Sequence, residues 1–501
     1  MAKSLRAINQ VDQRKMSLRL QAIGLPNPMI SPFLQKVDKW VRCSGLDWTV
    51  SKLKGLKTDL IRLRSGQSPT SWIRKNRSGS YAGPVGSIIR WSLVSDKNFK
   101  RGIQALNLYT SWIRSDLSLQ QKEKFFASLN APKQDLGFMP SYLFGTAKDC
   151  IGSLEVRLPD PAPLISYKGR ESVKAPIFRS KKSKRQSEDI LDELKMFFPG
   201  FQGEFLRRKF PQIFPALFKG LDIHPVPEKV QFDFNFNIEV GKIAFIQEPG
   251  HKLRYVASPY RVFQEALRPL GDYLYSVARS LEWDCTHDQS KAFGPIKDSL
   301  ARGITVHSVD LTSATDMFPM ELQVAVVRAL SGPKNLDYVD LWSMLARGSW
   351  DSEFGKLRWN KGQPLGMYPS FAAFTITHGI LLKMLCGESY SGQFYVLGDD
   401  VVILDDELFS DYMECLDKIG CPYSPSKTIS SKELAEFAGK ILTKDWVIPS
   451  YKWRSMSDDN FIDICKALGP KSRRLLRPRQ RVIFDLVKHI MEPIGLNFSF
   501  P

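Results

Sequence analysis

Two neighbouring carboxylates, Asp399 and Asp400, stand between two apolar runs, and Gly398 directly precedes them. Residues 395–397 and 401–404 are strand formers, and glycine adopts the positive φ of a tight turn, so the sequence predicts a β-hairpin with both acids at its bend. Adjacent carboxylates repel each other, and a divalent cation relieves that repulsion. Because no His or Cys lies nearby, this oxygen-only pair favours Mg²⁺, with Mn²⁺ possible, over zinc. A solvated turn without a ligand is the alternative.

A second acidic motif lies upstream, where residues 304–309 are expected to form a strand that ends at Asp310. If Asp310 and Asp399 meet on neighbouring strands, they can bridge two metal ions about 3.5–4 Å apart, the arrangement that aligns in-line phosphoryl transfer in nucleotide polymerases. Asp316 is placed to hydrogen-bond a ribose hydroxyl. Alternatively, it caps the helix that the sequence predicts over residues 320–330.

Between the acidic motifs, residues 361–371 hold two glycines and two prolines and lead into an apolar stretch, residues 371–386. Such a loop lets the backbone approach a sugar-phosphate closely, and Ser370 adds a hydroxyl at the helix start. The apolar stretch is too short and too polar to span a bilayer. His378 within it is expected to pack or to support the site from behind, with a metal ligand as the alternative.

In this order the segments resemble motifs A, B and C of viral RNA-dependent RNA polymerases, and more narrowly those of mitoviruses and narnaviruses. Residues 248–257 resemble the basic motif F, 284–289 resemble the segment before motif A, and 424–427 and 436–440 resemble motifs D and E. The resemblance implies an α+β right-hand fold of fingers, palm and thumb, with an antiparallel palm sheet that carries the catalytic carboxylates. It also implies RNA-directed RNA synthesis from nucleoside triphosphates by two metal ions, in the replication of a capsidless single-stranded RNA replicon.

The same resemblance assigns roles to individual residues. Asp310, Asp399 and Asp400 would hold two Mg²⁺ ions. Lys427 would donate a proton to the leaving pyrophosphate or, alternatively, only neutralise local charge. The expected nucleotide-binding residues, of which the two basic ones would grip the triphosphate, are Lys252, Arg254, Asp316, Gly366 and Ser370.

Motif B departs from the common pattern because Phe374 stands where many RNA polymerases have an Asn that helps to read the 2′-hydroxyl. By hypothesis, Asp316 and Ser370 take over that role. A reverse transcriptase would share the paired acids, but Leu397 and Gly398 differ from its usual residues before Asp-Asp, and Asp316 favours ribonucleotides. A non-catalytic, endogenised RNA-binding relic is a further alternative, against which the intact acids in one uninterrupted frame weigh.

The charge balance favours a polyanionic partner, here the RNA template and product. Lys and Arg outnumber Asp and Glu by 71 to 52, for a net charge of +19, although a membrane surface would also attract such a chain. The basic segments 179–185 and 471–481 are expected to touch phosphate, with solvated loops as the alternative. The expected RNA-binding residues are Lys181, Lys182, Lys184, Arg185, Lys440, Arg473, Arg474 and Arg477.

We predict four ranges along the chain. Residues 1–160 form an N-terminal region with part of the fingers, 161–300 the fingers with motif F, 301–445 the palm, and 446–501 a short basic thumb. A proline cluster at residues 158–163 is the candidate linker at the first boundary. Seven scattered cysteines without zinc spacing point to a reducing compartment.

No stretch is expected to span a membrane or to act as a secretory signal, and no obligate protein partner is evident. The basic first 25 residues suggest a mitochondrial transit peptide, with a basic helix on RNA or on the fingers as the alternative. The resemblance implies synthesis inside the host mitochondrion, with the cytoplasm as the alternative.

Overall fold

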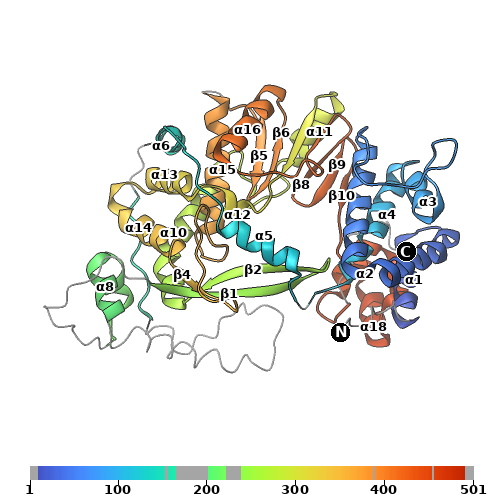
Figure 1. Ribbon diagram of the computed structural model, residues 1–501, viewed down its shortest axis with the longest axis horizontal. Helices are drawn as coiled ribbons and strands as arrows, with labels where there is room; N and C mark the ends of the chain where they lie inside the picture. Colours follow the sequence, from blue (N-terminus) through green and yellow to red (C-terminus); the bar gives the residue numbers. More distant parts are fainter. Residues whose placement is uncertain are drawn as a thin grey trace.

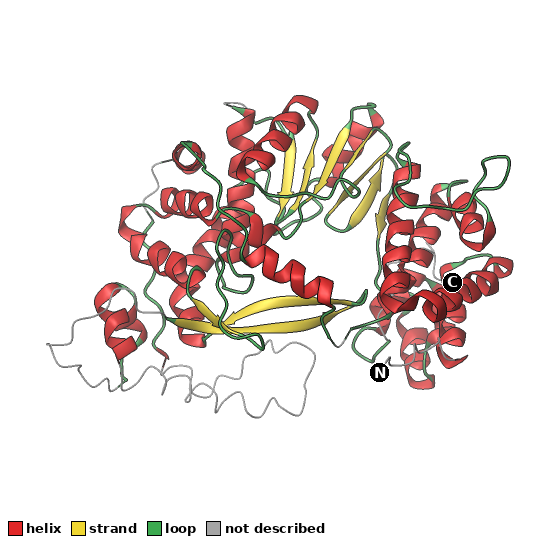
Figure 2. Ribbon diagram, in the orientation of Figure 1, coloured by secondary structure: helices red, strands yellow, loops and turns green. Residues whose placement is uncertain are grey.

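The computed structural model describes residues 10–114, 116–152, 156–164, 201–221, 238–387, 390–453 and 456–490. Within these ranges, helices surround three separate sheets, a mixed α and β architecture (Figure 2). The predicted α+β class is therefore confirmed. The basic segment 179–185, with Lys181, Lys182, Lys184 and Arg185, lies outside the described residues.

Four antiparallel strands form the central sheet, in the order β5-β6-β3-β7. Helix α15 packs against β5, and α16 packs against β6. The prediction of an antiparallel sheet that carries the acids is confirmed, because Asp310 ends β3 and Asp400 begins β6. The strands are β3 (Val306–Asp310), β5 (Phe394–Leu397), β6 (Asp400–Ile403) and β7 (Ile429–Ser431).

The helices beside this sheet follow the sequence signals. The helix predicted over residues 320–330 is α13 (Met320–Ser331), which begins after Pro319 and ends at Gly332 with a φ of 68°. The apolar stretch is α15 (Ser370–Cys386), whose residues are mostly buried. The other helices here are α10 (Arg261–Ser280), α11 (Phe293–Ala301), α12 (Ala314–Met317), η4 (Pro333–Asn335), α14 (Leu336–Ala346) and α16 (Asp406–Ile419).

A long two-stranded ribbon, β1–β2, runs across the bottom of the molecule in Figure 1, and its turn points at α2. Gly250 and His251 form the turn with φ values of 99° and 57°, and both of their N–H groups donate to the carbonyl of Trp112, at 3.0 and 2.9 Å. Strand β4 pairs with β1 in parallel. The elements here are β1 (Glu239–Glu248), β2 (Lys252–Pro259), β4 (Ser349–Asp351), α5 (Leu119–Leu129), α8 (Phe201–Lys209) and α9 (Phe214–Leu217), whereas α6 (Met139–Ile151) packs against α13 and α15.

The N-terminal helices form a block at the right of Figure 1. Its longest helix, α2, bends at Gly45, where a φ of 83° interrupts the helical geometry. The hydrophobic core of this block also contains apolar residues from the opposite end of the described chain, including Ile448, Trp453 and Leu468. The block consists of α1 (Gln10–Ile23), α2 (Asn27–Arg64), α3 (Gly83–Ser92), α4 (Asp96–Leu106) and η1 (Asn107–Ser111).

The C-terminal strands form a third, antiparallel sheet in the order β10-β9-β8. Lys57 of α2 donates to Ser450 Oγ, directly after β10, at 3.3 Å, and Gln67 donates to the carbonyl of Ser430, in β7 of the central sheet, at 3.0 Å. The N-terminal block therefore contacts the ribbon turn on one side and the C-terminal strands on the other. The elements here are β8 (Leu434–Phe437), β9 (Lys440–Thr443), β10 (Val447–Pro449), α17 (Phe461–Leu468), η5 (Pro470–Leu475) and α18 (Pro478–Val487).

The predicted division at residues 160, 300 and 445 stays a prediction. The proline cluster near residue 160 is hydrogen-bonded to η4 and α14. The N–H of Leu158 donates to Asn335 Oδ1 at 3.0 Å, and Tyr338 donates its hydroxyl to the carbonyl of Pro159 at 2.9 Å. Within the described ranges, no helix combines the length and the apolar character needed to cross a bilayer.

Candidate active site

The predicted hairpin forms, although only Asp399 lies in its bend, because Asp400 already begins β6. Strands β5 and β6 pair with Leu397 opposite Asp400, which leaves Gly398 and Asp399 as the bend of the hairpin. Gly398 has a φ of 61°, and a side chain there would come within 2.8 Å of the Phe371 ring. Glycine is therefore required at this position both by the backbone conformation and by the neighbouring aromatic ring.

The register of the central sheet brings the two acidic motifs together. Asp310 lies directly opposite Asp400 on the antiparallel strands β3 and β6. Such pairs have Cα atoms about 4.5–5.5 Å apart. Asp399 lies at the turn that immediately precedes Asp400, so three carboxylates gather at one end of the sheet, as the sequence predicted for Asp310 and Asp399.

The proximity of these acids changes their protonation. Burial, together with the negative charges of Asp399, Glu436 and Asp310, raises the pKa of Asp400 to about 7. Desolvation and the charge of Asp310 also raise the pKa of Asp399. Both shifts show that ionising these closely spaced carboxylates costs free energy. A bound cation would offset that cost.

Lys427 supplies one such cation. Its Nζ lies 2.7 Å from Asp310 Oδ2, and both side chains are partly exposed, at 47% and 37%. A backbone hydrogen bond also connects the segment before Lys427 to the end of β3, because the N–H of Ser424 donates to the carbonyl of Asp310 at 2.8 Å. The ion pair agrees with local charge neutralisation, while proton donation by Lys427 stays a prediction.

The donor set fits Mg²⁺ better than a metal that needs a complete protein cage. The structure as described contains no group of three His, Cys, Asp or Glu side chains already arranged around a metal position. Mg²⁺ is commonly bound by one or two carboxylates, with waters and substrate phosphates as the other ligands. Asp310 and Asp399 would provide such carboxylates, and the Lys427 ammonium occupies a cation position on Asp310.

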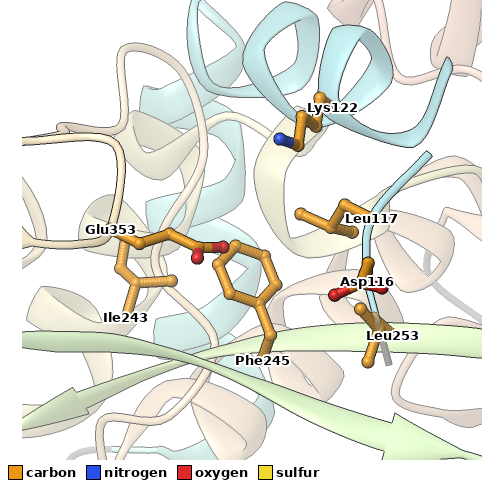
Figure 3. A pocket seen from close by; sticks show the side chains of 7 residues that line it. All are labelled: Asp116, Leu117, Lys122, Ile243, Phe245, Leu253 and Glu353. Atoms are coloured by element: carbon orange, nitrogen blue, oxygen red, sulfur yellow. The ribbon is translucent and has the colours of Figure 1, made fainter. Parts of the chain in front are cut away.

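The basic side chains of β2 face the acids. Leu253 lines a cavity of about 340 Å³ between the ribbon and α5, together with Asp116, Leu117, Lys122, Ile243, Phe245 and Glu353 (Figure 3). Because successive side chains of a strand alternate in direction, Lys252 and Arg254 point away from this cavity. Their positive charges act on Asp399 and lower its pKa, against the larger effect of burial. Arg254 Nε also lies 2.9 Å from Glu248 Oε1.

The glycine loop is fastened to the ribbon and to α10. Ala257 of β2 donates to the carbonyl of Leu365 at 2.7 Å, and Gln264 donates to the carbonyl of Gly366 at 2.8 Å. Gly366 has a φ of 141°, and a side chain there would collide with the carbonyl of Ala257. Ser370 is 2% exposed, with its Oγ 3.4 Å from the carbonyl of Pro364. The Ser370 hydroxyl, which was predicted to contact the sugar, is therefore buried in this conformation.

Asp316 is 1% exposed, and both of its carboxylate oxygens accept hydrogen bonds. Trp359 Nε1 donates to Oδ1 at 2.8 Å, and the hydroxyl of Tyr255 donates to Oδ2. Burial raises the pKa of Asp316. The alternative role as a helix cap is wrong, because Pro319 occupies the N-cap position of α13 and no side chain caps that helix.

Helix α15 holds the acidic turn from behind. The N–H of Gly398 donates to Thr375 Oγ1 at 3.0 Å, and Thr375 donates in turn to Asp284 Oδ2 at 3.0 Å. His378 Nδ1 lies 2.8 Å from the carbonyl of Gly398, and its Nε2 lies 2.7 Å from the hydroxyl of Tyr412. Burial lowers the pKa of His378 to about 4, so the neutral ring donates from Nδ1 and accepts at Nε2. The expectation that His378 packs behind the site is confirmed.

The sequence motifs assigned no role to four residues that contact the site: Tyr255, Trp359, Thr375 and Tyr412. The one available signal was the spacing of Thr375 and His378, two polar residues three positions apart in a mostly apolar helix, which places them on one side. Tyr255 and Trp359 come from distant segments, and no local pattern links either of them to Asp316.

The predicted RNA-binding residues are dispersed. Lys440 begins β9, with its Nζ 4.8 Å from the centre of the Phe293 ring. Arg473 pairs with Asp485 at 2.7 Å, whereas Arg474 and Arg477 are exposed near the start of α18. Their contact with RNA stays a prediction.

Comparisons with known proteins also find similarity to viral RNA-dependent RNA polymerases. Residues 214–459 match the family Mitovirus RNA-dependent RNA polymerase. Over 207 residues, 40% of this chain, the sequence is 30% identical to the RNA-directed RNA polymerase of Cryphonectria parasitica mitovirus 1, and the match spans only 25% of that protein. Two uncharacterized mitochondrial proteins of Arabidopsis thaliana are 28% and 32% identical over 34% and 30% of this chain, and the matches span 73% and 77% of those proteins.

Among solved structures, the RNA-dependent RNA polymerase of BmCPV at its elongation state superposes with a TM-score of 0.53. The superposition covers 92% of this chain and 47% of that chain, at 10% sequence identity. At such identity the likeness shows a shared fold.

Proposed function

Since the chain belongs to the mitovirus RNA-dependent RNA polymerase family, we propose that it is an RNA-directed RNA polymerase that copies an RNA template from ribonucleoside triphosphates. The observation that carries the proposal is the register that sets Asp310 beside Asp400, next to Asp399 at the turn. Across from these acids stand Lys252 and Arg254, so carboxylates for metal ions and cations for a triphosphate face the same space.

Asp310 and Asp399 would hold two Mg²⁺ ions, with Asp400 beside them. When bound, these ions supply charge neutralisation at the attacking 3′-hydroxyl and at the leaving pyrophosphate. The fixed turn keeps the carboxylates in place without reorganisation, because Gly398 is bonded through both its N–H and its carbonyl. Preorganised groups of this kind are effective because they need not move during the reaction.

The cationic residues bind and orient the triphosphate. Arg254 presents a planar guanidinium suited to bidentate phosphate contact, and Lys252 adds a point charge beside it. The ammonium of Lys427 has three donors, of which Asp310 uses one, so another can reach an oxygen of the leaving pyrophosphate. Proton donation from Lys427 would then accompany departure of that group.

Ribose selection is proposed to occur by exchange of hydroxyl donors on Asp316. In this conformation the hydroxyl of Tyr255 donates to Asp316 Oδ2. A ribose 2′-hydroxyl that replaces Tyr255 keeps the buried carboxylate hydrogen-bonded, whereas a deoxyribose offers no replacement donor. Ser370 would support the sugar only if the glycine loop moves, because its hydroxyl is buried.

The test is templated synthesis by the purified full chain with a single-stranded RNA template, Mg²⁺ and either ribo- or deoxyribonucleotides. We expect ribonucleotide incorporation that Asp399→Asn abolishes while RNA affinity stays near the wild-type value. Asp411→Asn, which neutralises an exposed acid on α16, is the matched control. Preference for deoxyribonucleotides would instead indicate a reverse transcriptase, and RNA binding without synthesis would indicate a non-catalytic relic.

The proposed partners are template and product RNA, nucleoside triphosphates and Mg²⁺, and the proposed substrate RNA is a capsidless single-stranded replicon. We further propose action in the host mitochondrion. The mitochondrial names of the two Arabidopsis relatives support this location. Imaging of the tagged full chain against mitochondrial and cytoplasmic markers tests it.

A further inference from the structure

One face of helix α2 extends from the ribbon turn to the C-terminal strands. Asp47 Oδ1 on this face lies 2.9 Å from His251 Nδ1 of the turn. Further along the helix, Lys57 donates to Ser450 Oγ at 3.3 Å. With 3.6 residues per turn, positions seven and three apart lie on nearly the same side, so Lys54 projects from this face between the two contacts.

Lys54 keeps contact with solvent although the surrounding protein partly desolvates its ammonium group, whereas its neighbours Leu53 and Leu56 are buried in the core of the N-terminal block. The two contacts of α2 fix the direction of this exposed side chain. Figure 1 shows this helix between the end of the β1–β2 ribbon and strand β10, so the face that carries Lys54 lies between these two elements.

Two lysines from other segments lie close enough to Lys54 to act on its charge. Burial and the positive charges of Lys427 and Lys252 lower the pKa of Lys54, and the nearby negative charge of Asp310 opposes that shift. Burial, Arg254 and Lys427 likewise lower the pKa of Lys252. Three ammonium groups therefore repel one another near Asp310. They belong to Lys54 on α2, Lys252 on β2 and Lys427 in the loop before β7.

We propose that Lys54 binds the phosphate groups of the incoming nucleoside triphosphate together with Lys252 and Lys427. This inference rests on the proposed polymerase function, which brings a triphosphate to Asp310. A multiply charged anion between the three lysines replaces their mutual repulsion with attraction. Lys54 lies outside residues 214–459, so the family match assigns it no role.

The inference makes the N-terminal block part of the nucleotide site as well as a structural support. A phosphate of the RNA backbone offers the same chemistry as a triphosphate. The two sources differ in what they change, since loss of a triphosphate contact raises the KM for nucleotide, whereas loss of a backbone contact weakens RNA binding.

The first experiment compares Lys54→Ala with Lys39→Ala, which removes an exposed lysine of the same helix before the Gly45 bend. We expect Lys54→Ala to raise the KM for nucleoside triphosphates by about tenfold or more, as for loss of a charged hydrogen bond, with RNA affinity unchanged. Lys54→Arg should keep most of the wild-type KM. An unchanged KM, an equal rise in Lys39→Ala, or a fall in RNA affinity alone overturns the assignment.

A second experiment does not depend on catalysis. Calorimetry of inorganic pyrophosphate binding to the full chain without RNA should show severalfold weaker binding for Lys54→Ala and wild-type binding for Lys39→Ala. If the wild-type chain makes no RNA but still shows this difference, the proposed function fails and the anion site stands. If pyrophosphate binds both variants equally, the anion site fails whatever the polymerase assay shows.

Discussion

Substitution of Thr375 tests whether helix α15 positions the catalytic acids. Thr375 Oγ1 accepts from the N–H of Gly398 and donates to Asp284 Oδ2, each at 3.0 Å. Thr375→Val keeps the shape of the side chain but leaves the buried Gly398 N–H without this acceptor. An unsatisfied buried N–H costs about 1–3 kcal/mol. If that cost falls on the acidic turn, it corresponds to a roughly five- to hundredfold change in the half-saturating Mg²⁺ concentration or in kcat.

Thr377→Val is the matched control. Thr377 is equally buried on the same helix, but its hydroxyl donates only to the carbonyl of Ala373 in its own helix, at 2.7 Å. That carbonyl keeps its helical partner, so the change should be nearly neutral.

The assay measures nucleotide incorporation as a function of Mg²⁺ concentration, together with the free energy of unfolding. We expect Thr375→Val to raise the half-saturating Mg²⁺ concentration and to lower kcat, because the carboxylates lose a fixed position. Thr377→Val should change neither quantity. A variant Thr375→Val that loses stability but keeps the wild-type Mg²⁺ dependence would refute the positioning role.

Three further predictions concern charge and sugar choice. Because the folded-state pKa of Asp400 is raised to about 7, above the usual value of about 3.9, its contribution to stability is present at low pH and lost as pH rises to neutral. Without Mg²⁺, Asp400→Asn should therefore raise the Tm relative to wild type more at pH 8 than at pH 5; equal gains at both values would contradict this shift. RNA affinity should fall with salt by a log–log slope of about −0.7 per phosphate contacted, and Arg474→Ala with Arg477→Ala should make that slope shallower unless the segment lies off the RNA path. Asp316→Ala should reduce the ribo- to deoxyribonucleotide ratio of kcat/KM by about ten- to hundredfold, whereas Tyr255→Phe should not reduce it; an unchanged ratio in Asp316→Ala would remove Asp316 from sugar recognition.

The acidic turn could be predicted because each step is local. Strand formers flank Gly398, and the glycine satisfies a φ of 61° that a side chain would resist beside Phe371. Once that hairpin and the strand ending at Asp310 are recognised, the antiparallel register of the central sheet is the remaining step. The family resemblance supplied the expectation that these strands are neighbours.

The surroundings of Asp316 could not be predicted in the same way. Its position suggested either a helix cap or a sugar contact, both of which are local or ligand-based roles. Its hydrogen-bond partners, Tyr255 and Trp359, come from β2 and from the loop after β4. Tertiary packing brings these segments together, and neither periodicity nor spacing along the chain encodes that encounter.

The N-terminal block illustrates the same limit at a larger scale. The sequence predicted an N-terminal region with part of the fingers, and the core of this block includes Ile448 and Trp453 from the opposite end of the described chain. Contacts over such a separation depend on how several sheets and helices pack. For that reason no sequence motif identified Lys54, although its charge acts together with those of Lys252 and Lys427.

The charges at the site form two groups that are each unfavourable alone. Burial and the mutual repulsion of the carboxylates of Asp310, Asp399 and Asp400 raise the pKa of Asp400 to about 7. The lysines that face them repel one another as well, and within the described chain Lys427 joins the two groups through its 2.7 Å contact with Asp310. A Mg²⁺ ion relieves repulsion in the first group, and a triphosphate relieves repulsion in the second. Either ligand alone leaves one group uncompensated, so the arrangement favours binding of metal and nucleotide together over binding of either one separately.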